Sequence, residues 1–585
     1  MIKRMAQCVR EYKGATFLTF IFIVIEAVIE TFIPFITANL INNIQAAGNE
    51  GFDIMMVLKT GGVLVVMAAV SLACGGIAGI TCAKASAGFA KNLRSDIFRK
   101  VQTYSFENID KFSSASLVTR MTTDVTNVQM AFMMIIRIAI RAPLMLIFAI
   151  VMAFIMGGAL ATSFVVLIPV LVVGLIIIAR LAMPRFRSVF KKYDRLNESI
   201  EENVRGIRVV KGFAREDYEK KKFGTAAEDI CKDFTKAERI VALNNPLMQV
   251  CIYFNMAFVL VVGSMLIIKS GATTINVGEM SAMITYGMQI LIQLMMLSMI
   301  YVMLTISAES IKRIFEALEE ESTLTNPENP LYEVPDGSIS FDNVKFKYSA
   351  RAKQFALTDV NLEIKSGMTV GIIGSTGSAK SSLVQLIPRL YDVTEGSVKV
   401  GGHDVREYDI KTLRDSIGMV LQKNVLFSGT IKDNIRWGNE NATDEEIVKA
   451  CQLACAEEFI LANPEGYDKM IEQGGANVSG GQKQRLCIAR ALIKKPKILI
   501  LDDSTSAVDT RTDALIRKGF KEYIPETTKI IIAQRISSVQ ESDLILVMDN
   551  GRISDMGTHE QLLASSEIYR EVFEEQTSGG DADEQ

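Results

Sequence analysis

The sequence predicts a protein of two parts, an all-helical membrane domain followed by an α/β domain. Apolar residues make up 49% of the 585-residue chain, and their long runs are confined to its first half. From residue 337 onward, short segments rich in β-branched residues alternate with helical segments, which is typical of an α/β domain. The formal net charge of -3 does not indicate a nucleic-acid-binding protein.

Six apolar runs, each of roughly the 20 residues that a helix needs to cross a bilayer, occur in the first half of the chain. The first run lacks a small-residue cleavage site, so it predicts a retained membrane helix rather than a signal peptide. We therefore expect residues 1–320 to form a transmembrane domain. The expected helices lie near residues 16–38, 56–80, 133–156, 160–182, 247–268 and 281–306.

Basic residues predict the orientation of these helices. Lysine and arginine cluster before the first run, between the second and third, and after the fourth. The loops around 46–53, 157–159 and 270–277 carry few of them. By the positive-inside tendency, we expect a multi-pass protein of the cytoplasmic membrane with both termini and the α/β domain in the cytoplasm.

Two long, charged, helical connections join the second run to the third and the fourth to the fifth. Arms of about 17–20 residues would project on the order of 25–30 Å from the bilayer. Their tips, SFENIDKF (105–112) and RGIRVVKGFARED (205–217), could dock on another domain. The polar, proline-bearing segment 321–336 predicts a linker to an α/β domain over 337–576, and 577–585 predicts a disordered tail.

A glycine-rich segment, GIIGSTGSAKSS, follows an apolar strand and opens a helix, which is the context of a phosphate-binding loop. Backbone amides of such a loop point at phosphates; the alternative is an ordinary glycine-rich turn. We expect Lys380 to reach the β- and γ-phosphates of a nucleotide and Ser381 to ligate Mg²⁺. Ala379 replaces the usual last glycine. Its methyl group is tolerable at negative φ and costs about 1 kcal/mol or more at positive φ. The expected nucleotide-binding residues of the loop are Gly374, Ser375, Thr376, Gly377, Ser378, Ala379, Lys380, Ser381 and Ser382.

Three further residues are expected at the same site. Asp502 ends the apolar segment ILILD and would hold the Mg²⁺ shell. Gln422, in GMVLQKNVLF, would complete that shell and contact the membrane domain, and Tyr348 would stack on adenine. Ordinary packing is the better interpretation of any one tyrosine or glutamine, but the spacing of all these segments favours a nucleotide site.

A second glycine segment, VSGGQ, precedes the helical segment QKQRLCIARALI. The hydroxyl of Ser479 and the backbone amides of Gly480, Gly481 and Gln482 would meet an anion at a helix N-terminus. This segment lies far from the phosphate loop in the sequence, so one chain cannot easily fold the two onto each other.

The order of these segments over residues 337–570 resembles that of the ABC transporter superfamily, with a phosphate loop, a glutamine, an SGGQ signature, the ILILDD segment and SAVD (Ser506 to Asp509). The first half resembles the six-helix exporter-type membrane domain of that superfamily, through weaker motifs such as SLVTRMTTDVTNV (116–128). The resemblance implies an ABC exporter domain followed by a cytoplasmic P-loop nucleotide-binding domain. It also implies that two nucleotide domains meet head to tail, so that the signature and Asp509 contact ATP held by the partner's phosphate loop.

Two residues of the expected hydrolytic step depart from the superfamily pattern. A glutamate that polarises the attacking water is expected after Asp502, but Asp503 is one methylene shorter, which withdraws its carboxylate by roughly 1.5 Å. A base must come within about 2.6–3.2 Å of its proton, and a displacement near 1 Å can cost on the order of a hundredfold in rate. The switch histidine is replaced by Gln534, which donates a hydrogen bond but carries no positive charge. The alternative is neutral drift at both positions.

This asymmetry resembles the degenerate-site subunit of heterodimeric bacterial multidrug ABC exporters. The resemblance implies a chain that binds ATP and Mg²⁺ at an impaired site and lends its signature to a second, non-identical half-transporter. The pair would export hydrophobic or amphipathic compounds, whether drug-like, lipid or peptide. Alternatives are a homodimeric lipid or peptide exporter, an importer built on the exporter fold, and a nucleotide-gated regulatory subunit or channel that does not pump.

Among the charged residues within the apolar runs, four form two pairs: Glu26 and Glu30 in the first run, Arg137 and Arg141 in the third. Members of each pair are four apart and therefore share a helix face. Charges within a membrane often line a polar cavity, so these residues are candidates for contact with cargo. The favoured alternative is an ion pair between the two helices or arginines that extend to lipid headgroups.

Overall fold

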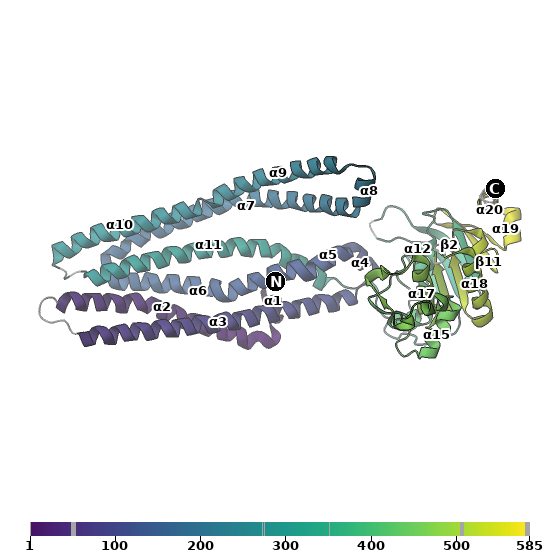
Figure 1. Cartoon of the computed structure of the whole chain (residues 1–585), viewed down its shortest axis with the longest axis horizontal. Coiled ribbons are helices and arrows are strands. Elements are labelled where there is room, and N and C mark those ends of the chain that lie inside the picture. Colours follow the sequence, from purple (N-terminus) through teal and green to yellow (C-terminus); the bar gives the residue numbers. More distant parts are fainter. Residues whose placement is uncertain are drawn as a thin grey trace. The chain divides into compact units, whose positions relative to one another are not determined.

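The computed structural model describes residues 2–47, 54–271, 273, 275–349, 352–503 and 508–578. The chain divides into two compact units, coloured by sequence in Figure 1. The first comprises Met1–Gln102 and Ala115–Glu320, and the second comprises Thr103–Ser114 and Glu321–Gln585. The segment Thr103–Ser114 therefore packs with the second unit, although it lies between two membrane helices in the sequence.

The described residues of the first unit form helices and short turns, with no strand. Among the residues that the structure describes, six helical segments are long and apolar enough to cross a membrane, which confirms the predicted six-helix domain. The helices are α1 (Ile2–Gln7), α2 (Lys13–Ala47), α3 (Ile54–Gln102), α5 (Ser114–Thr119), α6 (Val125–Gly157), α7 (Thr162–Arg205), α8 (Ile207–Gly212), α9 (Glu216–Val241), α10 (Asn244–Ser270) and α11 (Val277–Glu319). Short 3-10 turns cover Arg10–Tyr12 and Gly158–Ala161, and a π-helical turn covers Arg120–Asp124.

Several helices run well beyond their apolar segments. Helix α3 has 49 residues, about 74 Å at 1.5 Å per residue, so it projects far past the hydrocarbon layer. Within this unit α2 lies beside α3, α6 beside α11, and α7 beside α9 (Figure 1). The buried Tyr286 hydroxyl donates to the backbone carbonyl of Thr31 at 2.8 Å, which ties α11 to α2.

A buried carboxylate fixes α6 against α11 at the π-helical turn. Asp124 is completely buried and accepts hydrogen bonds from Ser310, at 2.8 Å, and from the guanidinium of Arg313. Arg120 donates to the backbone carbonyl of Arg313. Because a buried carboxylate needs such partners, the segment SLVTRMTTDVTNV serves here as a polar contact between two long helices.

The described residues of the second unit form three sheets. A six-stranded sheet has the order β12-β11-β3-β10-β9-β6, with all neighbours parallel except β12, and a four-stranded antiparallel sheet has the order β2-β1-β4-β5. Strands β7 and β8 pair alone. The strands are β1 (Ile339–Phe346), β2 (Leu357–Ile364), β3 (Thr369–Gly374), β4 (Glu395–Val400), β5 (His403–Asp404), β6 (Ile417–Val420), β7 (Gly429–Thr430), β8 (Met470–Ile471), β9 (Ile498–Asp502), β10 (Thr528–Ile532), β11 (Leu544–Asp549) and β12 (Arg552–Gly557).

The helices of this unit connect the strands as an α/β domain requires, which confirms the predicted fold class. They are α4 (Phe106–Phe112), α12 (Lys380–Gln385), α13 (Ile410–Asp415), α14 (Ile431–Arg436), α15 (Asp444–Leu453), α16 (Glu457–Leu461), α17 (Gly480–Leu492), α18 (Thr510–Tyr523), α19 (His559–Ser565) and α20 (Glu567–Ser578). Short 3-10 turns cover Gly466–Asp468, Gln473–Gly475 and Ile536–Ser538.

The central strands of the larger sheet position the candidate site. Strand β9, ILILD, is buried along its whole length, as expected for a parallel strand covered on both faces. Strand β10 lies between β3 and β9, and the last pairs of its register are Ile532 with Ile372 and Ile532 with Asp502. The residues that follow β3, β9 and β10 therefore leave the sheet at one edge.

Both ends of the second unit are more ordered than the sequence predicts. The predicted disordered tail, 577–585, begins too early, because α20 continues to Ser578; residues 579–585 lie outside the described residues. The segment 321–336 packs on the rest of the unit: Asn326 donates to Asp409 at 2.6 Å, and Leu331 forms a β-bridge with Tyr408. In the first unit, residues 48–53, which belong to the loop expected around 46–53, also lie outside the described part of the chain.

Candidate functional site

The segment between β3 and α12 forms a tight loop closed by its own lysine. The ammonium group of Lys380 donates to the backbone carbonyls of Gly374 and Ser375, both at 2.7 Å, and to the Ser378 hydroxyl at 3.3 Å. Burial lowers the pKa of Lys380, and the nearby carboxylates of Asp502 and Asp503 oppose this shift. A lysine held inside a glycine-rich loop at a helix N-terminus is the arrangement that binds phosphate groups.

Ala379 adopts a left-handed conformation, with φ 70° and ψ 26°, immediately before α12. Of the two conformations, negative φ and positive φ, this is the strained one, and it carries a conformational cost of about 1 kcal/mol. The neighbouring Gly377, at φ 88°, has no such cost because it lacks a Cβ.

The residues at the end of β9 fit a magnesium site. The Ser381 hydroxyl donates to Oδ1 of Asp502 at 3.0 Å, and Asp502 is only 3% exposed. Burial raises the pKa of the Asp502 carboxyl, and the Ser381 hydrogen bond opposes the shift. A hydroxyl and a carboxylate are the oxygen donors that Mg²⁺ takes beside nucleotide phosphates. Gln422 follows β6, the strand next to β9, but in the described structure its exposed side chain makes no hydrogen bond to Ser381 or Asp502.

Asp503 and Gln534 contact each other directly. Nε2 of Gln534 donates to Oδ2 of Asp503 at 2.8 Å. Asp503 has a φ of 49° and donates its backbone amide to the Ile532 carbonyl at 3.1 Å. Gln576 of α20 holds the backbone around Gln534. Its side chain donates to the Gln534 carbonyl and accepts from the Ile536 amide, both at 2.9 Å. Sequence reasoning singled out both Asp503 and Gln534 but found neither their pairing nor Gln576.

Tyr348 lies beside the phosphate loop. Its hydroxyl shares a 2.7 Å hydrogen bond with Ser382, and its ring packs edge-on against Tyr391, with centroids 5.1 Å apart. Burial raises the pKa of Tyr348, although 39% of the residue stays exposed. A half-exposed ring anchored at its hydroxyl leaves a face on which a purine base can stack.

Tyr391 connects Tyr348 to helix α4. The Tyr391 hydroxyl donates to Asp110 at 2.7 Å, and the ring lies 5.9 Å from that of Phe106. Burial, and then Asp110, raise the pKa of Tyr391. Asp110, Tyr391, Tyr348 and Ser382 thus form a continuous path from α4 to the phosphate loop. The sequence predicted that 105–112 docks on another domain, but no motif pointed to Tyr391.

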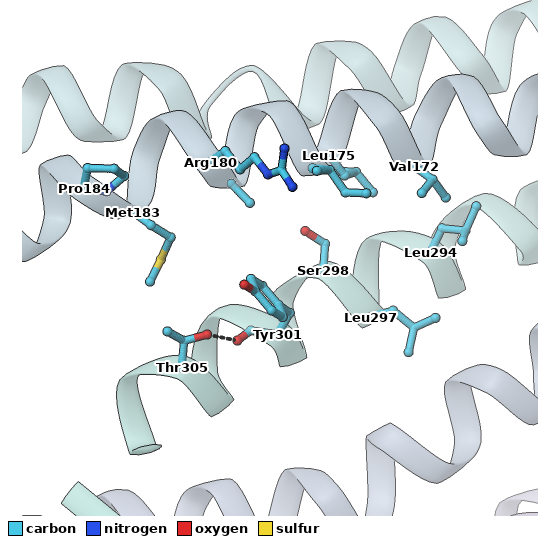
Figure 2. Close-up of a pocket in the computed structure, with 12 residues that line it drawn as sticks. Val172, Leu175, Arg180, Met183, Pro184, Leu294, Leu297, Ser298, Tyr301 and Thr305 are labelled. Carbon is cyan, nitrogen blue, oxygen red and sulfur yellow. Dashed lines mark hydrogen bonds between the residues drawn. The ribbon is translucent and has the colours of Figure 1, made fainter. Parts of the chain in front are cut away.

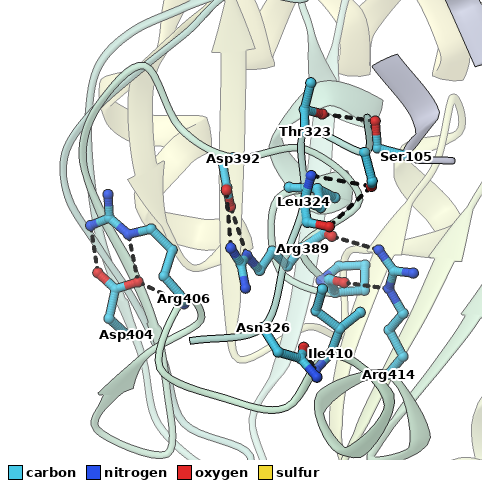
Figure 3. A network of polar contacts seen from close by, with 12 residues as sticks. Ser105, Thr323, Leu324, Asn326, Arg389, Asp392, Asp404, Arg406, Ile410 and Arg414 are labelled. Atoms are coloured by element: carbon cyan, nitrogen blue, oxygen red, sulfur yellow. Dashed lines mark hydrogen bonds and ion pairs between the residues drawn. The ribbon is translucent and has the colours of Figure 1, made fainter. Parts of the chain in front are cut away.

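Further polar contacts hold α4 and the turn that carries Tyr391; Figure 3 shows the residues that make them. Ser105, which caps α4, shares a 2.8 Å hydrogen bond with Thr323. On the other side, Arg389 pairs with Asp392, and Arg414 donates to the Arg389 carbonyl at 2.7 Å. The turn that carries Tyr391 is therefore held by arginine contacts on both flanks.

The signature segment forms a separate helix N-terminus. The Ser479 hydroxyl accepts from the Gln482 amide, and the Gln482 side chain accepts from the Ser479 amide, at 3.3 and 3.1 Å. Gly480 and Gly481 form the first turn of α17. Asp509 caps α18 by accepting from the Thr512 amide at 2.9 Å. In the described residues no hydrogen bond joins these groups to the loop Gly374–Ser382; Ser506 lies outside those residues.

In the membrane unit, Arg141 of α6 pairs with both glutamates of α2. Its guanidinium lies 2.7 Å from Glu30 and 3.4 Å from Glu26, so it ties the two helices together. Arg137 lies one turn away and has no ion pair among the described residues. Together, Arg137 and Arg141 line a cavity of about 290 Å³ between α6 and α11.

The described geometry defines a phosphate-loop domain joined to a six-helix membrane domain. A family model described as the ABC transporter transmembrane region matches residues 16–295, and one described as ABC transporter matches residues 357–506. The chain is 36% identical to the uncharacterized ABC transporter ATP-binding protein YfiB of Bacillus subtilis (strain 168), over 94% of each protein. It is 33% identical to the uncharacterized ABC transporter ATP-binding protein Rv1273c of Mycobacterium tuberculosis (strain H37Rv), over 99% of this chain and 98% of the relative. The chain therefore belongs to the ABC transporter family.

A solved structure of a bacterial Atm1-family ABC exporter with ATP bound shares the fold. The TM-score is 0.82 at 24% sequence identity, covering 97% of this chain and 98% of that one. The family assignment implies that the α/β domain binds ATP and that the six long helices lie in a membrane.

Proposed function

We propose that this chain is one half of an ABC exporter whose own site binds ATP and hydrolyses it poorly. The observation that carries this is the 2.8 Å hydrogen bond from Gln534 to Asp503. It occupies a carboxylate oxygen at the position where a general base would accept a proton from water, and geometry is the first requirement for such a base. The shorter side chain of Asp503 adds to the impairment.

In contrast to the hydrolytic residues, the residues expected to bind ATP and Mg²⁺ match the superfamily pattern apart from Ala379. The phosphate-loop amides and Lys380 would hold the ATP phosphates, and Tyr348 would stack on adenine. Ser381, Asp502 and Gln422 would hold Mg²⁺, which when bound neutralises phosphate charge. Slow hydrolysis with intact binding makes this a site that retains ATP.

The signature segment supports a role at a partner's nucleotide site. Ser479, Gly480, Gly481 and Gln482 form a well-capped and largely exposed helix start, and a positive helix end suits a phosphate. We infer that it completes the phosphate site of a second, non-identical half-transporter, with Asp509 contributing across the same interface. Hydrolysis at the partner's site would then drive transport.

The membrane unit would carry hydrophobic or amphipathic compounds across the cytoplasmic membrane, with both termini and the nucleotide-binding domain in the cytoplasm. The whole-chain similarity to a solved exporter supports export. The basic segments that flank the apolar runs support the orientation.

Affinity purification of this chain from its native membrane tests the partner, because a second ABC half-transporter should come with it. The ATPase rate of the purified pair should change less than twofold in Asp503→Glu. It should fall almost to zero when the catalytic carboxylate of the partner is replaced. A chain that forms a homodimer with vigorous ATPase activity would exclude the heterodimer.

A further inference from the structure

The membrane unit contains a cavity of about 630 Å³ between α7 and α11, a size typical of small-molecule sites. Both helices contribute to its wall, as Figure 2 shows, and Ser298 points from α11 toward α7. At one end the wall is formed by aliphatic side chains such as Val172, Leu175 and Leu294. This end can hold the apolar part of a ligand.

The other part of the cavity has a single charge. Arg180 of α7 faces the space near Ser298 and Tyr301 of α11. No carboxylate is among the residues that line the cavity, and in the described part of the chain Arg180 forms no ion pair. Its side chain is exposed to the cavity.

An unpaired guanidinium in a membrane span needs an anion or water. Arg180 lies within the candidate span Thr162–Phe186, where a charge is costly unless it is paired or reaches a headgroup. Arg185, five residues later, shows the contrasting case, because it donates to the Leu181 carbonyl of its own helix at 3.0 Å and is not among the residues that line this cavity. Arg180 instead presents its planar set of donors to a cavity, and that geometry matches a carboxylate, sulfonate or phosphate.

The spacing along α7 sets the shape of the ligand. Val172 and Arg180 are eight residues apart, which corresponds to about 12 Å along the helix. A ligand that reaches both must carry its anionic group at one end of an extended apolar body. Hydroxyls on Ser298 and Tyr301 can donate to the same anion.

We propose that the cavity between α7 and α11 binds amphiphiles that carry one anionic group, with Arg180 as the residue that binds the anion. The inference rests on the proposed export function and names the class of cargo. The shared chemistry covers a free amphipathic acid and an anionic phospholipid, which differ in their source.

Binding can be measured with the intact pair in nanodiscs of zwitterionic lipid, without nucleotide. Three fluorescent probes share one pyrenyl-alkyl body and end in a carboxylate, a primary amide or a trimethylammonium group. The carboxylate probe should bind at least about tenfold more tightly than the trimethylammonium probe, as expected for a charge-assisted pair. Arg180→Gln should remove that preference while the amide probe binds as before, which shows that the cavity is intact.

Two variants sharpen the result. Arg180→Lys keeps the positive charge but loses the planar, paired donors of the guanidinium. A reduced preference for the carboxylate probe should therefore remain. Arg185→Gln removes a neighbouring arginine outside the cavity, and the preference should be unchanged. A carboxylate preference that survives Arg180→Gln, or one that is lost in Arg185→Gln, would overturn the inference.

Two additions to this experiment distinguish a bilayer lipid from a free amphiphile, and the export proposal from the cargo-class proposal. If added anionic phospholipid competes with the carboxylate probe, the ligand comes from the bilayer. If it does not compete, the ligand is a free amphiphile. ATP-dependent uptake of the carboxylate probe into inside-out vesicles tests export. Arg180-dependent binding without uptake would overturn export alone, whereas uptake without Arg180-dependent selectivity would overturn the cargo class alone.

Discussion

Gln534 and Asp503 are hydrogen-bond partners, with Nε2 of the amide 2.8 Å from Oδ2 of the carboxylate. They leave the sheet from neighbouring parallel strands, Gln534 after β10 and Asp503 after β9. The two departures from the superfamily pattern are therefore one structural arrangement. A change at one position alters the environment of the other, and the pair should be tested together.

Restoring both positions should restore hydrolysis at this chain's own site. In a pair whose partner site is inactivated, Asp503→Glu with Gln534→His should raise phosphate release by on the order of tenfold to a hundredfold, because the carboxylate then reaches the water. Either change alone should give only a small part of this gain. Adding Lys380→Ala should abolish the activity. Equal gains from one change and from both would contradict a coupled arrangement.

Removing the Tyr391 hydroxyl should loosen α4 from the nucleotide-binding domain. Tyr391→Phe loses the hydrogen bond to Asp110, worth about 1–2 kcal/mol, so amide hydrogen exchange across 103–114 should quicken by about five- to thirtyfold. ATP affinity should change less than twofold, because the Tyr348 ring keeps its packing. Tyr408→Phe is the matched control, since that hydroxyl donates to the Val400 carbonyl at 2.8 Å. Unchanged exchange in Tyr391→Phe would exclude this anchoring role.

Ala379→Gly should stabilise the nucleotide-binding domain. A left-handed alanine costs about 1 kcal/mol, and glycine removes that strain while adding some entropy to the unfolded chain. The net gain of up to about 1 kcal/mol corresponds to a rise of about 2–4 °C in the melting transition of a domain of this size. Scanning calorimetry of the full chain would measure it. Thr376→Gly is the control, because Thr376 is exposed and is not left-handed, so the change adds glycine flexibility to the same loop without relieving strain. A lower Tm for Ala379→Gly would contradict the assigned strain.

The sequence was sufficient for features that depend on local pattern. Long apolar runs predicted the six membrane helices, and the apolar segment ILILD predicted a buried strand ending in Asp502. What it missed depends on which strands become neighbours. The pairing of Asp503 with Gln534 requires β9 and β10 to be adjacent, and 31 positions of sequence separation give no hint of this.

The contact between α4 and Tyr391 was hidden for a similar reason. Asp110 and Tyr391 are 281 positions apart, and an aromatic residue in a turn has no signature of its own. The conformation of Ala379 was also open, because alanine is compatible with either sign of φ until the loop around it is fixed. The spacing of motifs predicted the candidate site residues, whereas the residues that contact them became known only from the tertiary structure.

Ser479→Ala should separate this chain's two roles. If Ser479 contacts ATP held by the partner, the substitution should lower the ATPase rate of the pair by about tenfold or more, since hydrogen bonds to charged groups are worth about 1.5–3 kcal/mol. ATP photolabelling of the loop Gly374–Ser382 should remain. The residue also caps α17, so a loss of about 1 kcal/mol in helix stability is expected. Thr558→Ala removes an equivalent cap from α19 and should reproduce the stability loss without the loss of ATPase. Equal ATPase rates in the two variants would show that Ser479 serves only its own helix.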